Sequence, residues 1–143
     1  MTPQPPPIDA VAVLEHSLAL VVERIGDPAP RVYDALFAQD PTLRELFVGD
    51  TLGSVRGEMF HRVIDTLIDV AGERPYAAGM IVAERSNHLM NGVSPAQFQA
   101  FFDTVVQVLR QALGEDWSAQ IDAAWQATLH RVGQISAQAA LQA

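Results

Sequence analysis

Residues 88–113 read HLMNGVSPAQFQAFFDTVVQVLRQAL, and this stretch shows most directly how the chain folds. The pair Asn91-Gly92 favours the left-handed backbone at which helices end, whereas Ser94-Pro95 favours the first turn of a new helix. After this turn, apolar side chains recur every three or four positions: Phe98, Phe101, Phe102, Val105, Leu109 and Leu113. The stretch therefore predicts the end of one helix, a tight turn, and a second amphipathic helix that ends at Gly114.

The same spacing of apolar residues extends over the rest of the chain. It predicts helices over residues 9–25, 30–39, 52–70 and 76–91, a short helical turn over 42–47, and a last helix that begins at Asp116 or Ser118. The helix over 52–70 is strongly apolar, with Leu52, Val55, Met59, Phe60, Val63, Ile64, Leu67 and Val70. No segment shows the alternation of a strand. We therefore predict an all-α fold.

The chain is long and apolar enough to bury the core of a single domain, since 49% of its 143 residues are hydrophobic and 18% are charged. We assign this domain to residues 8–137. The proline-rich residues 1–7 are expected to form a disordered leader, and residues 138–143 a frayed tail.

Charge and composition exclude several classes of function. The net charge is −8, and nine arginines without a lysine form no basic run, so we expect no nucleic-acid partner. The absence of cysteine excludes disulfides and thiolate metal sites. No apolar run approaches the roughly 20 residues of a membrane helix, and the N-terminus does not resemble a secretion signal. We therefore expect no membrane association and a cytoplasmic location.

The four histidines lie in four different predicted helices, and no two of them have the i,i+4 spacing of a helical zinc site. We expect His16 and His130 to lie on the surface and His61 to flank a buried helix face. His88 differs because it lies four residues before Gly92, close to a helix end. By residue type alone, His88 is a structural histidine that interacts with the helix dipole.

Three segments place His88 in a wider pattern. The first is VYDALF at 32–37 followed by DPTLRELF at 40–47, the second is HLMNGVSP at 88–95, and the third is ALGEDW at 112–117 with AAW at 123–125. In this order they resemble the globin family, specifically the single-domain bacterial globins and the globin domain of flavohaemoglobins. The resemblance covers about residues 32–132.

The resemblance implies a globin fold of about six helices around a pocket for haem b, with His88 binding the iron. It implies that Tyr33 directs its hydroxyl toward a gas ligand, that Phe47 stacks on the haem, and that Val93 belongs to the turn beside the pocket. The residue types agree, because a haem needs an apolar slot and one neutral imidazole. The helices over 52–70 and 76–91 could form the walls. Without the resemblance, Tyr33 could be half-buried with a surface hydroxyl, and Phe47 an ordinary core residue.

The distal residue, commonly glutamine or histidine in the family, has no clear counterpart. Counting without gaps from Phe47 selects Gly57 and turns Asp65 inward, against the apolar pattern. The next choices along the helix are Val55 and Arg56.

One helical turn further on, Met59 or Phe60 would line the pocket. We prefer Val55 together with Met59, because they continue the apolar stripe of Leu52, Val63 and Leu67. Arg56 would then reach toward a haem propionate or solvent.

On the proximal side, Glu84 precedes His88 by four residues, where the family usually has an apolar residue. Side chains at this spacing can meet, and a carboxylate that accepts from the second ring nitrogen would make the imidazole a stronger donor to iron. Alternatively, Glu84 points outward and pairs with Arg85 or Arg62. The tyrosine and glutamate that assist the proximal histidine in flavohaemoglobins have no evident counterpart.

We expect a haem globin that binds oxygen, nitric oxide or carbon monoxide, as a monomer or a homodimer. Activity of nitric oxide dioxygenase or peroxidase type would need an external reductase, because we expect these 143 residues to form a globin domain without a reductase domain. Two rivals are a haem-free globin-fold domain for interaction or stress signalling, and a structural four-helix bundle without a pocket.

Overall fold

The computed structural model describes residues 9–142, so the predicted leader over 1–7 lies outside the described residues. Its elements in chain order are α1 (Ala10–Ile25), α2 (Ala29–Gln39), the 3-10 helix η1 (Pro41–Phe47), α3 (Ser54–Ala71), α4 (Ala77–Met90), α5 (Pro95–Leu113), the 3-10 helix η2 (Gly114–Asp116) and α6 (Ala119–Gln142). Residues 9–142 contain no strand, which confirms the all-α prediction.

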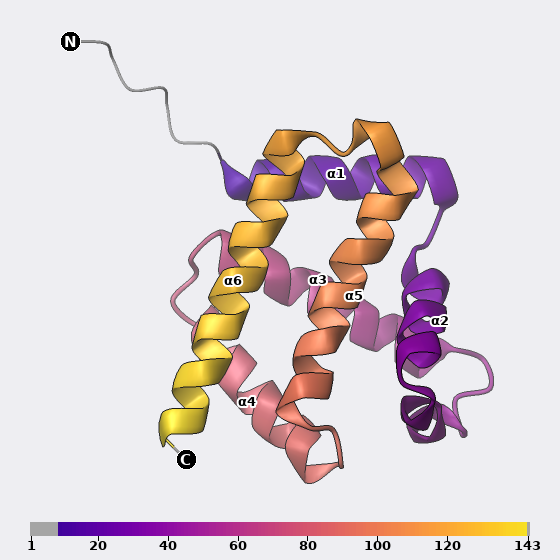
Figure 1. Ribbon diagram of the computed structural model, residues 1–143, viewed down its shortest axis with the longest axis vertical. Helices are drawn as coiled ribbons and strands as arrows, with labels where there is room; N and C mark the ends of the chain where they lie inside the picture. Colours follow the sequence, from indigo (N-terminus) through magenta and orange to yellow (C-terminus); the bar gives the residue numbers. More distant parts are fainter. Residues whose placement is uncertain (1–8, 143) are drawn as a thin grey trace.

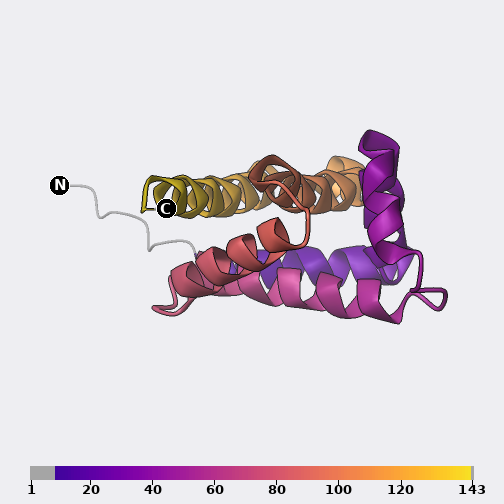
Figure 2. The same ribbon diagram turned by 90° about the horizontal axis from the view of Figure 1, so that it is seen from below.

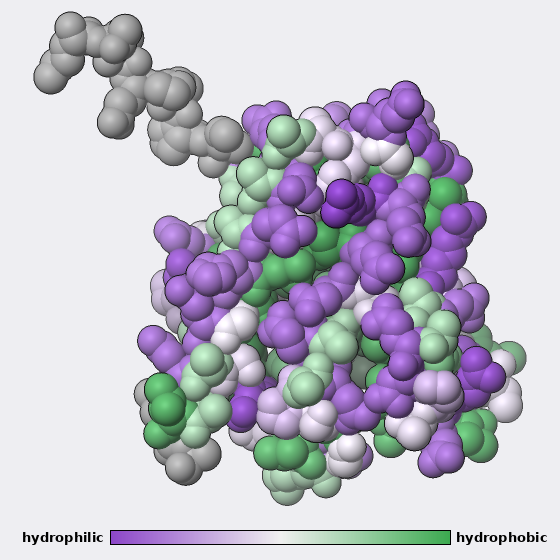
Figure 3. Space-filling model, viewed as in Figure 1, coloured by the Kyte–Doolittle hydropathy of each residue, from purple (hydrophilic) through white to green (hydrophobic). Residues whose placement is uncertain are grey.

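The helices form two layers (Figures 1 and 2). One layer contains α5 and α6 side by side, and the other contains α1 and α3. Helix α1 packs against α3, α5 and α6, while α4 packs against α3, α5 and α6. Helix α2 stands at one end, where it packs against α5, α3 and η1 (Figure 2). The face over α5 and α6 is mostly hydrophilic toward solvent (Figure 3), so the apolar sides of these helices face the other layer.

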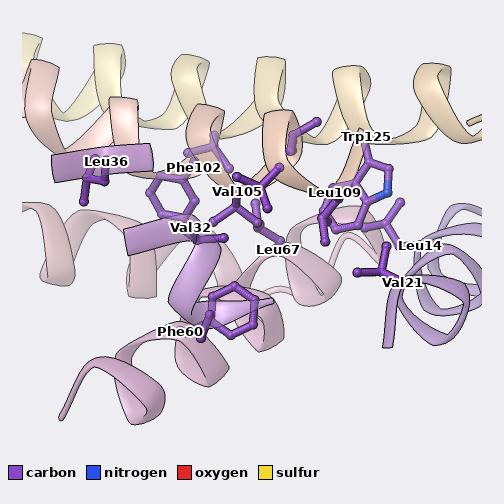
Figure 4. Close-up of a cluster of buried hydrophobic side chains, with 14 of the residues drawn as sticks. Leu14, Val21, Val32, Leu36, Phe60, Leu67, Phe102, Val105, Leu109 and Trp125 are labelled. Atoms are coloured by element: carbon purple, nitrogen blue, oxygen red, sulfur yellow. The ribbon is translucent and has the colours of Figure 1, made fainter. Parts of the chain in front are cut away.

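The core lies between the two layers (Figure 4). It joins Leu14 and Val21 of α1 to Leu67 of α3, Leu109 of α5 and Trp125 of α6, all of which are fully buried. The neighbouring Val22 is 55% exposed, so Val21 belongs to the apolar stripe of α1. Leu67 and Leu109 were predicted from their helical spacing, and the burial of all five side chains supplies much of the stabilisation of the fold.

The turn between α4 and α5 has the predicted geometry. Gly92 has a φ of +87°, in the left-handed region. Its N–H donates to the Leu89 carbonyl at 3.2 Å, and the Val93 N–H donates to the His88 carbonyl at 2.9 Å. This pair of bonds is a Schellman motif, which caps the carbonyls at the end of α4. Ser94 then caps α5 through a reciprocal capping box with Gln97.

Helix α3 begins two residues later than its apolar pattern predicts. Leu52 is 92% exposed and precedes the helix, so the prediction that it starts the buried stripe is wrong. The reason is local, because the Asp50 carboxylate accepts hydrogen bonds from the N–H groups of Val55 and Arg56. Gly53, with a φ of +76°, makes the bend that brings these groups together.

Helix α6 also differs from the expectation. The Ser118 hydroxyl accepts from the Ile121 N–H at 3.1 Å, so Ser118, not Asp116, starts the helix. At the other end α6 continues to Gln142, through most of the tail that we expected to fray from residue 138. Alanine and glutamine dominate this segment and favour helix even where little is buried.

Candidate functional site

His88 lies in the last turn of α4, and its ring is fixed by its own helix. Its Nδ1 lies 2.7 Å from the backbone carbonyl oxygen of Glu84. Because a carbonyl can only accept, the neutral ring carries its hydrogen on Nδ1. The lone pair of Nε2 is then available to a metal, which is the state that an imidazole ligand needs.

The Glu84 carboxylate lies close to the same ring nitrogen. Its Oε2 is 3.7 Å from Nδ1, which is longer than a hydrogen bond, and the side chain is 48% exposed. Within residues 9–142, Glu84 forms no ion pair with Arg85 or Arg62, and Arg85 donates to the Ser136 hydroxyl instead. The alternative that Glu84 pairs with one of these arginines is therefore wrong for this structure. The carboxylate therefore lies near the ring without a direct hydrogen bond to it.

Phe98 of α5 packs beside His88, with 5.3 Å between the ring centroids and 54° between the ring planes. Phe98 is buried, whereas the His88 side chain keeps 28% of its surface exposed. The contact restricts rotation of the imidazole. From the sequence, Phe98 was predicted only as part of the apolar stripe of α5. Its position soon after the Ser94-Pro95 turn brings it back toward the end of α4.

Tyr33 of α2 is buried, with 2% of its surface exposed. Its hydroxyl donates to the backbone carbonyl of Arg56 at 2.9 Å, so the alternative of a surface hydroxyl is wrong. The Tyr33 ring packs against three aromatic rings, and its centroid lies within 6.0 Å of the centroids of Phe37, Phe47 and Phe101. Burial raises the pKa of the Tyr33 phenol well above its usual value, which keeps the hydroxyl protonated and able to donate at neutral pH.

Asp50 connects Tyr33 to the start of α3, and the sequence analysis missed it. Its side chain is only 6% exposed and also accepts from Arg56 Nε at 3.1 Å. Burial raises the pKa of Asp50, but the hydrogen bonds from the Arg56 and Val55 amides and from the guanidinium outweigh this effect and lower the pKa overall. An acidic residue just ahead of a predicted helix start was the available signal.

The Arg56 side chain does not extend away from α3 toward a haem propionate or solvent. Its guanidinium pairs with the Asp50 carboxylate, and its Nη2 donates to the Asp50 backbone carbonyl at 2.9 Å. The expectation that Arg56 reaches toward a propionate or solvent is therefore corrected. The side chain is 32% exposed and is tied to the loop before α3.

The apolar residues expected around the pocket differ in burial. Phe60 is 4% exposed and belongs to the core, whereas Val55 is 51% exposed. Met59, Phe47 and Val93 are half-buried. Of the positions considered for the distal side, Gly57 is half-buried with open space around it, and Asp65 is exposed.

The other histidines lie on other helices than His88. His16 and His130 are exposed, as predicted, and His61 is exposed on α3. Over the part of the chain that the structure describes, no three His, Asp or Glu side chains are grouped so that they could hold a metal ion. None of the helices between residues 9 and 142 combines the length and the hydrophobicity that crossing a membrane requires.

Comparison with known proteins identifies the family of the chain. The family model described as Globin matches residues 30–135, a range that includes Tyr33, the start of α3, His88 and most of α6. No curated protein and no solved structure matches the chain. The family match covers well over half of the sequence, and the chain therefore belongs to the globin family.

Proposed function

We propose that this chain is a haem-binding globin in which His88 holds the iron and a diatomic gas is the ligand. One observation carries the proposal: the Nδ1 hydrogen of His88 is directed to the Glu84 carbonyl at 2.7 Å, which leaves Nε2 as a free donor atom. The contact with Phe98 keeps the ring in this orientation. A fixed neutral imidazole with one free nitrogen is the ligand that haem iron takes in globins.

The residues present fit a flat apolar group. Val55 exposes half of its surface, and Phe47, Met59 and Val93 are only partly covered, so apolar surface is available near the start of α3 and the end of α4. Contact with a porphyrin face would remove this surface from water. When bound, haem b would supply an iron centre that takes one diatomic ligand and changes between the ferrous and ferric states.

Tyr33 would supply the polar group on the ligand side. It is buried among aromatic rings, and its phenol stays protonated, so it can donate one hydrogen bond inside an apolar space. Such a bond favours ligands that accept hydrogen, with oxygen foremost. Val55, which precedes Arg56 in the sequence, would exclude water.

The test is a titration of the full chain with haemin. We expect an intense Soret band that saturates at about one haem per chain, and a shift of this band when the reduced protein takes carbon monoxide. The melting temperature should rise with haemin, since a ligand that binds only the folded chain stabilises it. A colourless protein with an unchanged melting temperature would refute the proposal and would favour a haem-free interaction domain or a structural bundle.

Glu84 supports a redox side activity of peroxidase type. A negative charge near the His88 ring stabilises ferric over ferrous iron, because the ferric centre carries one more positive charge. In the haem-loaded chain, Glu84→Gln should therefore raise the midpoint potential by roughly 20–60 mV, where 59 mV is a tenfold change in the ratio of the two states.

Spectroelectrochemistry measures this shift, and Glu15→Gln is the matched control. Glu15 is an exposed residue of α1, so its substitution changes the net charge equally but acts far from His88. Equal potentials in wild type and Glu84→Gln would exclude the role of the carboxylate. Sustained turnover, with nitric oxide or with peroxide, would draw electrons from an external reductase.

A further inference from the structure

A continuous set of hydrogen bonds connects the loop before α3 to Tyr33. The Asp50 carboxylate accepts from the Val55 N–H at 3.2 Å, from the Arg56 N–H at 3.0 Å and from Arg56 Nε at 3.1 Å. The Asp50 backbone carbonyl accepts from Arg56 Nη2 at 2.9 Å. The Arg56 backbone carbonyl accepts from the Tyr33 hydroxyl at 2.9 Å. Asp50 thus binds Arg56, and the Arg56 carbonyl in turn accepts from the Tyr33 hydroxyl.

These bonds fix the first turn of α3 in place. The Asp50 side chain is almost fully buried, and a buried carboxylate is tolerated only when several donors satisfy it. Three donors do so here, and they belong to residues that are adjacent in sequence. The direction of the Arg56 carbonyl therefore depends on the Asp50 carboxylate, because both backbone amides at the start of the helix are bound to it.

The Tyr33 hydroxyl has a single hydrogen to donate. In this structure that hydrogen goes to the Arg56 carbonyl. The ring centroids of Phe47 and Phe101 lie 5.5 and 5.4 Å from that of Tyr33, and these contacts restrict movement of the Tyr33 ring. A gas ligand that accepts a hydrogen bond from Tyr33 has to replace this protein acceptor.

We propose that Asp50 is a positioning residue that keeps the Tyr33 hydrogen bond directed at the Arg56 carbonyl, so that a bound gas competes with the protein for that hydrogen. This inference rests on the proposed function, because it concerns the ligand side of a haem site. As a consequence, Tyr33 retains bound oxygen less strongly than a tyrosine whose hydroxyl has no protein acceptor. A substitution that loosens the start of α3 should slow the dissociation of oxygen, because the Arg56 carbonyl then competes less well for the Tyr33 hydrogen.

The first experiment is a double-mutant cycle on the dissociation rate of oxygen from the reduced, haem-loaded chain. Asp50→Asn leaves one acceptor oxygen in place of two and loses the charge that strengthens all three bonds. We expect dissociation to slow by about fivefold in the wild-type background, which is the effect of one ordinary hydrogen bond. In a Tyr33→Phe background the same substitution should have no effect.

The control for this cycle is Asp65→Asn, which removes the same charge from an exposed position on α3. It should leave the rate unchanged in both backgrounds. An Asp50→Asn effect of equal size with and without the Tyr33 hydroxyl would overturn the proposal, because Asp50 would then act on the pocket in general. Faster dissociation in Asp50→Asn would overturn it as well.

The second experiment uses the haem-free chain and is independent of gas binding. Hydrogen exchange followed by NMR should show slow exchange of the Val55 and Arg56 amides, and Asp50→Asn should accelerate both by about tenfold or more. Unchanged exchange would show that Asp50 does not hold the turn and would overturn the inference. If Asp50→Asn does not fold, Arg56→Met replaces it in the dissociation cycle, since it removes the guanidinium bonds to Asp50 and keeps the backbone.

The two experiments separate this inference from the proposed function. A chain without a Soret band refutes haem binding, and with it the competition for the Tyr33 hydrogen. A normal Soret band with equal Asp50→Asn effects in both backgrounds refutes only the role of Asp50.

Discussion

His88→Ala should abolish the Soret band of the haem-loaded chain. The substitution removes Nε2, the nitrogen left free by the bond between Nδ1 and the Glu84 carbonyl, and Phe98 offers no donor atom in its place. The other three histidines lie on other helices, where His61 is exposed on α3 and His16 and His130 are exposed on α1 and α6. Iron would then lack its protein ligand.

The measurement is absorbance during haemin titration, together with thermal melting. A ligand at one hundred times its dissociation constant stabilises a protein by about 2.7 kcal/mol, so the variant should lose roughly this amount at the same haemin concentration. Free imidazole should partly restore the band, because it replaces the missing ring.

His61→Ala is the matched control, since it removes an imidazole from an exposed position while leaving α4 unchanged. Its Soret band should equal that of the wild type. A full band in His88→Ala, or its loss in His61→Ala, would contradict the assignment of His88 as the ligand.

The parts of this structure that the sequence predicts well are those set by neighbouring residues. The end of α4 needs a left-handed residue, and glycine at position 92 supplies it. The start of α5 needs a side chain that accepts from the third residue of the helix, and Ser94 supplies this acceptor. In both cases all the atoms concerned lie within a few positions of each other, so the local sequence contains the full information.

The parts that sequence reasoning missed depend on distant contacts or on a choice between two nearby acceptors. The bond from Tyr33 to Arg56 joins residues 23 positions apart, and only the packing of α2 against α3 creates it. From its spacing, Glu84 could meet the His88 ring or point outward to an arginine, and in the structure its Oε2 lies 3.7 Å from the ring nitrogen Nδ1. Spacing alone could not show that the Glu84 backbone carbonyl, and not the carboxylate, is the acceptor.

Leu52 illustrates a third limit. Its hydrophobicity and its spacing continue the apolar stripe of α3, yet it is almost fully exposed. The bonds that Asp50 makes to the helix start decide where α3 begins, and they place Leu52 outside it. Periodicity predicts a helix reliably, but the residue at which it begins depends on the groups that cap it.

Trp125→Ala should cause the largest loss of stability of any single truncation in the core. Trp125 is completely buried, and its Nε1 donates to the Ser17 hydroxyl at 2.9 Å. Ser17 in turn donates to the Leu14 carbonyl at 2.7 Å, so the indole joins α6 to α1. Removing it leaves a large cavity and an unsatisfied hydroxyl acceptor, which together cost about 3–5 kcal/mol.

Urea unfolding of the haem-free chain measures this loss, and Trp117→Ala is the matched comparison. Trp117 is only half-buried, and its Nε1 donates to Asp122, five residues away, so its truncation should cost clearly less. Because domains of this size are stable by only about 5–15 kcal/mol, Trp125→Ala should remove a large share of the free energy of unfolding, whereas Trp125→Phe should cost less. Equal losses for the two tryptophan truncations would show that the contact between α1 and α6 does not control the stability of the domain.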